Sequence, residues 1–220
     1  MVAQLLPAVV GAVLGLAAGG SLAGLRRPIA WWPLGLASIA LQLLLARIPV
    51  AEQPWLGTNG HWVWAAAVSA VLLVLVRNGW TQTGVRRLPW LVAAFGVALN
   101  LVVILANGGY MPVPQAALDQ TGQSAELAAR TAFRRDVPLD ERTTLPWLAD
   151  VLVDPAWLPR PLVASVGDRL LGLGLAGWTF LAVSNSRRRY ATRSAGSVLE
   201  GDLSASHRSS TSAATGLLAK

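Results

Sequence analysis

Four polar residues interrupt long apolar stretches of this chain, and their side chains are able to bind protons, cations or small solutes: Asp168, Asn100, Gln42 and Ser69. A carboxylate surrounded by hydrocarbon is costly unless it is paired or serves a function. Counted from the nearest loop at about 1.5 Å per residue, Asn100 and Asp168 each lie roughly 10 Å deep, and Gln42 and Ser69 lie at comparable depth. We therefore predict a shared intramembrane polar layer, with Asp168 as its most reactive member.

This polar layer has two interpretations. Amide, hydroxyl and carboxyl groups often join neighbouring helices by hydrogen bonds. The same groups are able to form a small-solute, proton or cation site that opens to the outside. Arg169 follows Asp168 directly and would either neutralise it or extend outward to the surface.

Evidence for catalysis is weak. The two histidines, His61 and His207, lie far apart in the sequence, and no phosphate loop, dinucleotide fingerprint, metalloprotease helix or serine-nucleophile motif is present. The chain has no cysteine, which excludes thiolate chemistry. We expect neither a cofactor nor a metal ion. Because no second catalytic group accompanies Asp168, the sequence favours a non-catalytic protein over an enzyme.

The polar residues must be positioned by helices, because five apolar stretches alternate with charged loops. These stretches cover residues 2–22, 29–46, 61–76, 88–106 and 162–183. Roughly 20 apolar residues cross the hydrocarbon core of a bilayer, and 54% of all residues are hydrophobic against 13% charged. The sequence predicts an all-α fold: an integral membrane helical bundle with five transmembrane helices. The third stretch is short, and it must either tilt little or include residues 55–60 in its span.

Charge sets the orientation of the bundle. Arginines gather in the first and third loops and directly after the fifth stretch, whereas the long loop at residues 107–161 holds most of the acidic residues. Positively charged loops remain in the cytoplasm, which puts the N-terminus outside and the C-terminus inside. We expect a domain of residues 1–189, followed by a disordered cytoplasmic tail at 190–220, in the bacterial plasma (inner) membrane.

The first stretch carries Gly11, Gly15 and Gly19 at every fourth position. Such a stripe lets another helix approach closely. That helix belongs either to the same chain or to a second protein, and the sequence does not separate the two. A cleaved signal peptide is the rival for this stretch, but no basic segment precedes it and arginines follow it.

The fourth stretch ends in an outer turn built from Asn107, Gly108, Gly109, Tyr110 and Pro112. Paired glycines permit left-handed backbone, and the proline prevents the helix from resuming. The favoured interpretation is a helix C-cap, and the alternative is a backbone cradle for a ligand.

At this turn the chain resembles an uncharacterised bacterial multi-pass membrane protein family, a domain of unknown function with an Asn-Gly-Gly-Tyr-Met-Pro-Val motif. The resemblance rests on residues 107–113, 148–151 and 165–168, and it spans about residues 1–185. It implies that these segments form one outward-facing unit, and it implies no activity.

The loop at 107–161 is too long for a simple connector, and we expect it to be partly helical, near residues 124–133 and 145–153. The resulting hypothesis is a non-catalytic integral membrane protein that acts as a scaffold or accessory subunit of a membrane complex. The expected partners are the lipid bilayer and another membrane protein or a second copy, not nucleic acid. The alternative is a small-solute or ion carrier that uses the polar layer.

Overall fold

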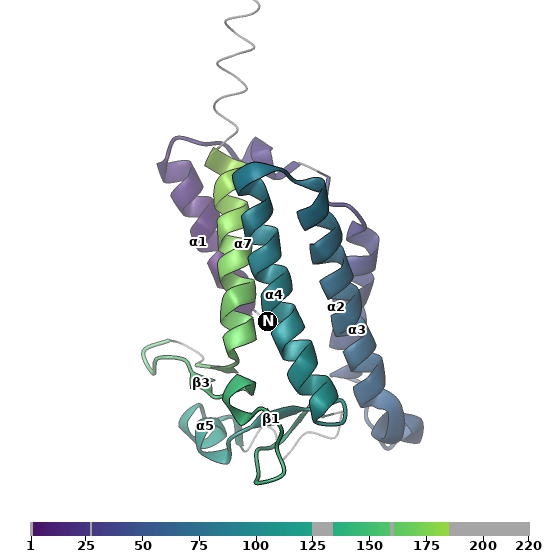
Figure 1. The fold of residues 1–220 in the computed structure, drawn as a ribbon. Helices are drawn as coiled ribbons and strands as arrows, with labels where there is room; N and C mark the ends of the chain where they lie inside the picture. Colours follow the sequence, from purple (N-terminus) through teal and green to yellow (C-terminus); the bar gives the residue numbers. More distant parts are fainter. Residues whose placement is uncertain (1, 27, 125–133, 159–160, 185–220) are drawn as a thin grey trace, which may run out of the picture.

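The computed structural model describes residues 2–26, 28–124, 134–158 and 161–184 (Figure 1). Its helices are α1 (Val2–Ala17), η1 (Leu22–Arg26), α2 (Trp32–Leu45), α3 (Pro54–Thr81), η2 (Gly84–Arg86), α4 (Arg87–Ala106), α5 (Gln115–Gln120), η3 (Pro146–Leu148) and α7 (Val166–Ser184), where η marks a 3-10 helix. Its strands are β1 (Met111–Val113), β2 (Asp136–Pro138), β3 (Leu152–Val153) and β4 (Val163–Ala164). The fold is mostly helical.

Three segments are long and apolar enough to cross a membrane: Pro54–Thr81, Gly84–Ala106 and Val166–Ser184. Two shorter apolar helices accompany them, Leu6–Ala17 and Trp32–Leu45. Each of the five expected stretches thus contains a helix. The helix α3 begins at Pro54, seven residues before the expected start at residue 61. Proline is favourable at the first position of a helix, because the backbone N–H that it lacks has no partner there.

The helices pack in a row whose order differs from the order of the chain. α1 packs on α7, α7 on α4, α4 on α3, and α3 on α2 (Figure 1). Although α1 and α2 are consecutive in sequence, they stand at opposite ends of this row. The connection between them must therefore cross the bundle, and η1 within it packs on α7.

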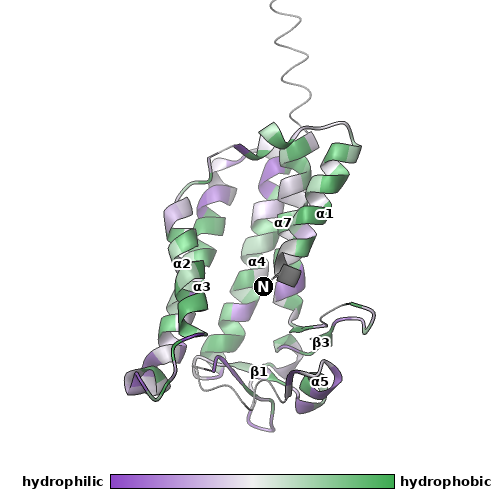
Figure 2. Ribbon diagram, turned by 180° about the vertical axis from the view of Figure 1, so that it is seen from behind, coloured by the Kyte–Doolittle hydropathy of each residue, from purple (hydrophilic) through white to green (hydrophobic). Residues whose placement is uncertain are grey.

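The two ends of the bundle differ in their connections. One end, here called the arginine end, holds residues 18–26 and 28–31, the 82–86 turn and the end of α7, whereas the other end holds the described segments between α4 and α7 (Figure 1). We call these segments, residues 107–124, 134–158 and 161–164, the cap. Figure 2 shows that hydrophobic residues dominate the helices between these ends.

The cap contains two small sheets. β1 pairs in parallel with β2, with Pro112 opposite Val137, and β3 pairs antiparallel with β4, with Leu152 opposite Ala164. The predicted helix at 145–153 is wrong, because this segment forms only the short turn η3 and then strand β3. Leu145 has a left-handed backbone (φ 57°) before Pro146, and the Asp150 N–H donates to the Pro112 carbonyl at 3.1 Å rather than within a helix. The other predicted cap helix, at 124–133, falls almost wholly outside the described residues, and so does the predicted tail at 190–220.

Two buried clusters hold the bundle together. One joins α2, α3, α4 and the cap, and its buried members are Leu45, Leu56, Trp64, Ala65, Val103, Ile104, Met111 and Leu148. The other joins α3 and α4 nearer the arginine end, through Leu75, Trp90, Ala93, Ala94 and Val97. Large apolar side chains also face outward along the helices, including Leu36, Phe95 and Leu173, which is 64% exposed. An exposed apolar surface of this extent needs an apolar environment or a partner.

Candidate functional site: the junction of bundle and cap

The first turn of α7 is fixed by a reciprocal pair of hydrogen bonds. The Asp168 N–H donates to the Ser165 Oγ at 2.9 Å, and the Ser165 N–H donates to the Asp168 Oδ2 at 3.2 Å. Ser165 precedes the helix and Asp168 is its third residue, which is the arrangement of a capping box. The carboxylate also lies at the helix N-terminus, where the helix dipole favours negative charge. Asp168 therefore has a structural role in starting α7.

Asn100 of α4 completes a ring with these two side chains. Its Nδ2 donates to the Asp168 Oδ1 at 2.9 Å, and its Oδ1 accepts from the Ser165 Oγ at 2.7 Å. Both carboxylate oxygens of Asp168 thus have donors. We call Asn100, Ser165 and Asp168 the polar ring; it connects the cap end of α4 to the start of α7.

Two glycines permit this contact between α4 and α7. A Cβ atom built on Gly167 would lie 2.0 Å from the Asn100 Oδ1, and one built on Gly96 would lie 2.4 Å from the Gly167 carbonyl oxygen. Any larger residue at either position would separate the helices. The absence of two side chains is thus what brings Asn100 within reach of Asp168.

The other two residues of the expected polar layer do not join the ring. The Ser69 Oγ donates to the Ala65 carbonyl of its own helix at 2.9 Å. Gln42 is half-buried on α2, at the far end of the helix row, and no hydrogen bond of its side chain is present among the described residues. The structure brings together Asn100 and Asp168 but connects neither of them to Gln42 or Ser69. It adds Ser165, which the Ser-x-x-Asp spacing of a capping box was able to reveal.

Arg169 does not pair with its neighbour Asp168. Its Nη2 lies 2.6 Å from the Oδ1 of Asp154 in the cap, and the Leu162 N–H donates to the other oxygen of Asp154 at 3.1 Å. Arg169 thus extends outward, which is one of the two arrangements that the sequence left open. Asp154 is buried at 8% exposure, so this ion pair anchors the segment before β4 to α7.

A second carboxyl group is buried near the polar ring. Asp150 is 8% exposed, and its Oδ1 is fully buried without a hydrogen-bond partner. Burial raises the pKa of Asp150 well above its ordinary value, and the negative charges of Asp168 and Asp136 add to this effect, while Arg135 opposes it. Asp150 lies in the 148–151 segment on which the family resemblance rests, but no spacing or motif in the sequence distinguishes its carboxyl group from the other acids of the cap.

Arg135 is engaged with a different acid. Its Nε lies 3.3 Å from the Asp136 Oδ1, and this negative charge is the main cause that raises the pKa of Arg135. The contact is an ion pair without hydrogen-bond geometry, since the same Asp136 oxygen makes no hydrogen bond. The side chain of Arg135 is half-exposed, so it also contacts solvent.

The outer turn is a helix C-cap that also attaches the cap to α4. Gly108 and Gly109 have φ values of 67° and 92°, and the Gly109 N–H donates back to the Ile104 carbonyl at 2.8 Å. A Cβ on Gly109 would lie 2.6 Å from the His61 Cδ2. The next residue, Tyr110, stacks on His61 with ring centroids 4.7 Å apart, and its hydroxyl lies 3.1 Å from the His61 Nδ1. This geometry favours the C-cap over a ligand cradle.

The glycine stripe of α1 is covered by α7 of the same chain. A Cβ on Gly11 would lie 2.1 Å from the Ala176 carbonyl oxygen, and one on Gly15 would lie 2.8 Å from the Val183 Cβ. The Thr179 Oγ1 donates to the Ala8 carbonyl at 2.8 Å across this contact. Gly19 does not belong to the stripe, because α1 ends at Ala17 and Gly19 is exposed with a φ of 78°.

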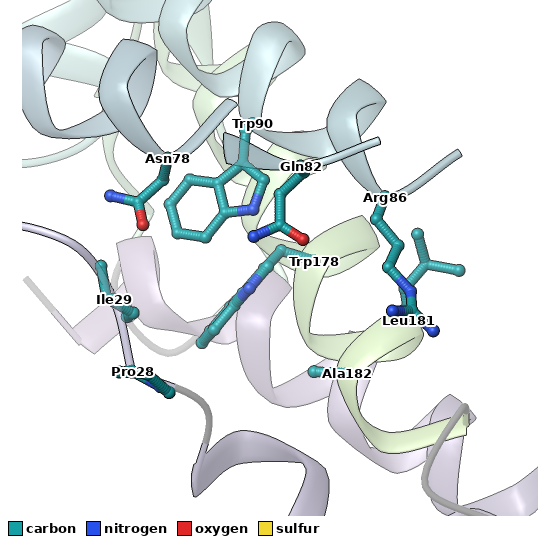
Figure 3. A pocket seen from close by; sticks show the side chains of 9 residues that line it. All are labelled: Pro28, Ile29, Asn78, Gln82, Arg86, Trp90, Trp178, Leu181 and Ala182. Atoms are coloured by element: carbon teal, nitrogen blue, oxygen red, sulfur yellow. The ribbon is translucent and has the colours of Figure 1, made fainter. Parts of the chain in front are cut away.

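A small pocket lies at the arginine end (Figure 3). Its walls include Asn78, Gln82, Arg86, Trp90 and Trp178, and the two tryptophan rings are tilted with centroids 5.5 Å apart. Its volume of about 30 Å³ has room for one or two waters. In the part of the chain that the structure describes, no group of three or more His, Cys, Asp or Glu residues is arranged to hold a metal ion.

Comparison with known proteins gives one family. Residues 27–180 match a family whose description reads "Family of unknown function (DUF5317)". The matched region runs from the connection before α2 to the last turns of α7 and includes the polar ring and the cap. No curated protein matches, and no solved structure matches.

Proposed function

The chain belongs to the family of unknown function DUF5317, and we propose that it is a five-span integral membrane protein that acts as a non-catalytic scaffold or accessory subunit of a membrane complex. Its N-terminus and cap face outward and its C-terminus lies in the cytoplasm of a bacterial cell, at the plasma membrane. The partners are lipid and another membrane protein or a second copy of the chain.

The membrane placement is supported by helix length, surface and charge. Three helical segments qualify by length and hydropathy, and two shorter apolar helices stand beside them. Arg26, Arg77, Arg86 and Arg87 belong to the connections and helix ends at the arginine end of the bundle, as cytoplasmic loops require.

The non-catalytic role is supported by the state of the polar ring. Asp168 accepts hydrogen bonds at both oxygens, and Asn100 and Ser165 use their side chains to bind each other and Asp168. A general acid or base must be able to reach a substrate proton. Within the ring these groups are instead committed to joining α4 and α7.

The order of the helices is the observation that carries the proposal of a partner. α2 stands at one end of the row and packs mainly on α3, while its Trp32, Leu36 and Ile39 side chains are exposed. Gln42 is half-buried at the margin of this helix, and its amide lacks a hydrogen bond within the described chain. An amide near hydrocarbon gains from a hydrogen bond to a further helix. We propose that a second membrane helix docks along α2 and satisfies Gln42.

The test begins with purification of the tagged protein from its native membrane in mild detergent, with mass spectrometry and mass determination of the intact particle. We expect a stoichiometric membrane partner or a defined homo-oligomer. Gln42→Leu should reduce this association, whereas Ser69→Ala is the matched control, because Ser69 bonds only within its own helix. A lone monomer, stable in every mild detergent tried, would overturn the proposal.

An ion or small-solute carrier is the second candidate. The observation that favours it is the burial of Asp150 in electrostatic contact with Asp168, close to the outward end of the bundle. This candidate predicts that Asp168→Asn abolishes flux into reconstituted vesicles and leaves the helical content unchanged. Unaltered flux in that variant would remove Asp168 from a transport role.

A further inference from the structure

A backbone hydrogen bond to β1 fixes Asp150 inside the junction of cap and bundle. Its N–H donates to the Pro112 carbonyl of β1 at 3.1 Å, and the preceding residue, Ala149, is 0% exposed. The side chain follows this backbone inward, so that Asp150 is more than nine-tenths buried and its Oδ1 has no donor. A buried carboxylate oxygen without a donor costs far more when ionised than when protonated.

The charged groups that act on Asp150 do not compensate a negative charge there. They are Asp168 from α7, Asp136 from β2, and Arg135 directly before β2. Arg135 is already paired with Asp136 at 3.3 Å. The donors around Asp168, the Asn100 amide and the Ser165 N–H, are likewise used. Ionised Asp150 would therefore place a second negative charge near Asp168, without a cation or a donor at its Oδ1 to offset it.

We propose that Asp150 is a proton-binding site that controls how firmly the cap closes on the bundle. With a proton bound, the side chain is neutral and remains buried between β1 and the polar ring. When the proton leaves, the carboxylate is drawn toward water and away from Asp168, and the cap opens. The ligand is a proton from the side of the membrane that the cap faces.

The raised pKa of Asp150 gives the direction of the effect. Because burial lifts the pKa in the closed state above the value in an open, hydrated state, closing takes up a proton. Closure is strongest below the ordinary carboxyl pKa and weakens as pH rises to the raised pKa. Between these limits, the ratio of open to closed protein should rise up to about tenfold per pH unit, and then level off.

The absence of cysteine from the chain permits a direct test. A single reporter, Ala149→Cys, sits at a fully buried position beside Asp150, and Ala51→Cys sits at an exposed position in the loop before α3. The maleimide labelling rate of the first, divided by that of the second, removes the intrinsic pH dependence of the thiol. We expect this ratio to rise with pH in the otherwise unchanged chain.

Asp150→Asn, which keeps the shape of the neutral acid, should hold this ratio low and flat across the pH series. Glu141→Gln is the matched control, since Glu141 is an exposed acid of the same cap, and it should retain the pH response. Amide hydrogen exchange of the 148–154 segment repeats the measurement without a reporter. A flat response in the unchanged chain, or the same response in Asp150→Asn, would overturn the proposal.

Discussion

The side chain of Asn78 pairs with the backbone of Ala30 through two hydrogen bonds: its Oδ1 accepts from the Ala30 N–H at 2.8 Å, and its Nδ2 donates to the Ala30 carbonyl at 2.9 Å. Asn107 pairs with Thr144 in the same way, with both distances at 2.9 Å. Each asparagine lies near the end of a helix and holds a connection from a distant part of the sequence. The two ends of the bundle are thus closed by the same device.

Replacing Asn78 by Asp should destabilise the bundle. Asn78 is buried at 3% exposure, and a carboxylate there would lose the donor and face the Ala30 carbonyl. An unsatisfied buried polar group costs about 1–3 kcal/mol. Thermal unfolding in detergent should show the loss, whereas Asn59→Asp, at an exposed position of the same helix, should have little effect. Equal stability of the two variants would mean that the hydrogen bonds between Asn78 and Ala30 contribute little to the stability of the bundle.

Gly11→Leu should separate α1 from α7. Its side chain would collide with the Ala176 carbonyl, and overpacking of this kind costs about 1–3 kcal/mol. Val13→Leu is the control, because Val13 is 57% exposed on the same helix. The measurement is resistance to unfolding and to limited proteolysis in detergent. If Gly11→Leu instead leaves the fold intact and changes the oligomeric mass, the stripe is an interface between chains.

The Asn100 and Asp168 side chains should be energetically coupled. Alanine substitutions made singly and together form a double-mutant cycle, and groups within one hydrogen-bonded network typically couple by about 0.5–3 kcal/mol. The same cycle on Ser69 and Asp168 should give no coupling, since Ser69 bonds to Ala65 within α3. Additive effects of the Asn100 and Asp168 variants would mean that the polar ring does not hold the helices together.

The sequence predicted where the helices lie along the chain, but it did not predict which helices pack against each other. The fourth stretch, expected at 88–106, became Arg87–Ala106, because apolar composition and the Asn107 turn mark both ends. The row order was not predictable, since it depends on close contacts such as Gly96 with Gly167 that have no signature in either helix alone. Depth counting assigned Asn100 and Asp168 to one level, and their side chains are hydrogen-bonded. Depth carries no information on lateral distance, so the same count grouped Gln42 and Ser69 with residues to which they do not bond.

The cap was harder to predict for a different reason. Leu145, Leu148 and Leu152 follow a helical spacing, but the turn that begins at Pro146 ends at Leu148, because Ala149 has an extended backbone and the Asp150 N–H donates to the Pro112 carbonyl instead. The strand pairs that replace the expected helix are only two or three residues long and join distant segments. Their stability comes from the tertiary contacts of the cap, which local sequence patterns do not contain.

We predict that the arginine end of the bundle faces the cytoplasm. Because the chain has no cysteine, this orientation can be measured by labelling single introduced cysteines. Single cysteines at Glu141 and Thr83 occupy exposed positions in the cap and in the turn before η2, at opposite ends of the bundle. An impermeant maleimide added to intact cells should label Glu141→Cys at once and Thr83→Cys only after permeabilisation. The reverse pattern would place the cap in the cytoplasm, where the arginines of the other end would oppose the positive-inside rule and the proton bound by Asp150 would come from the cell interior.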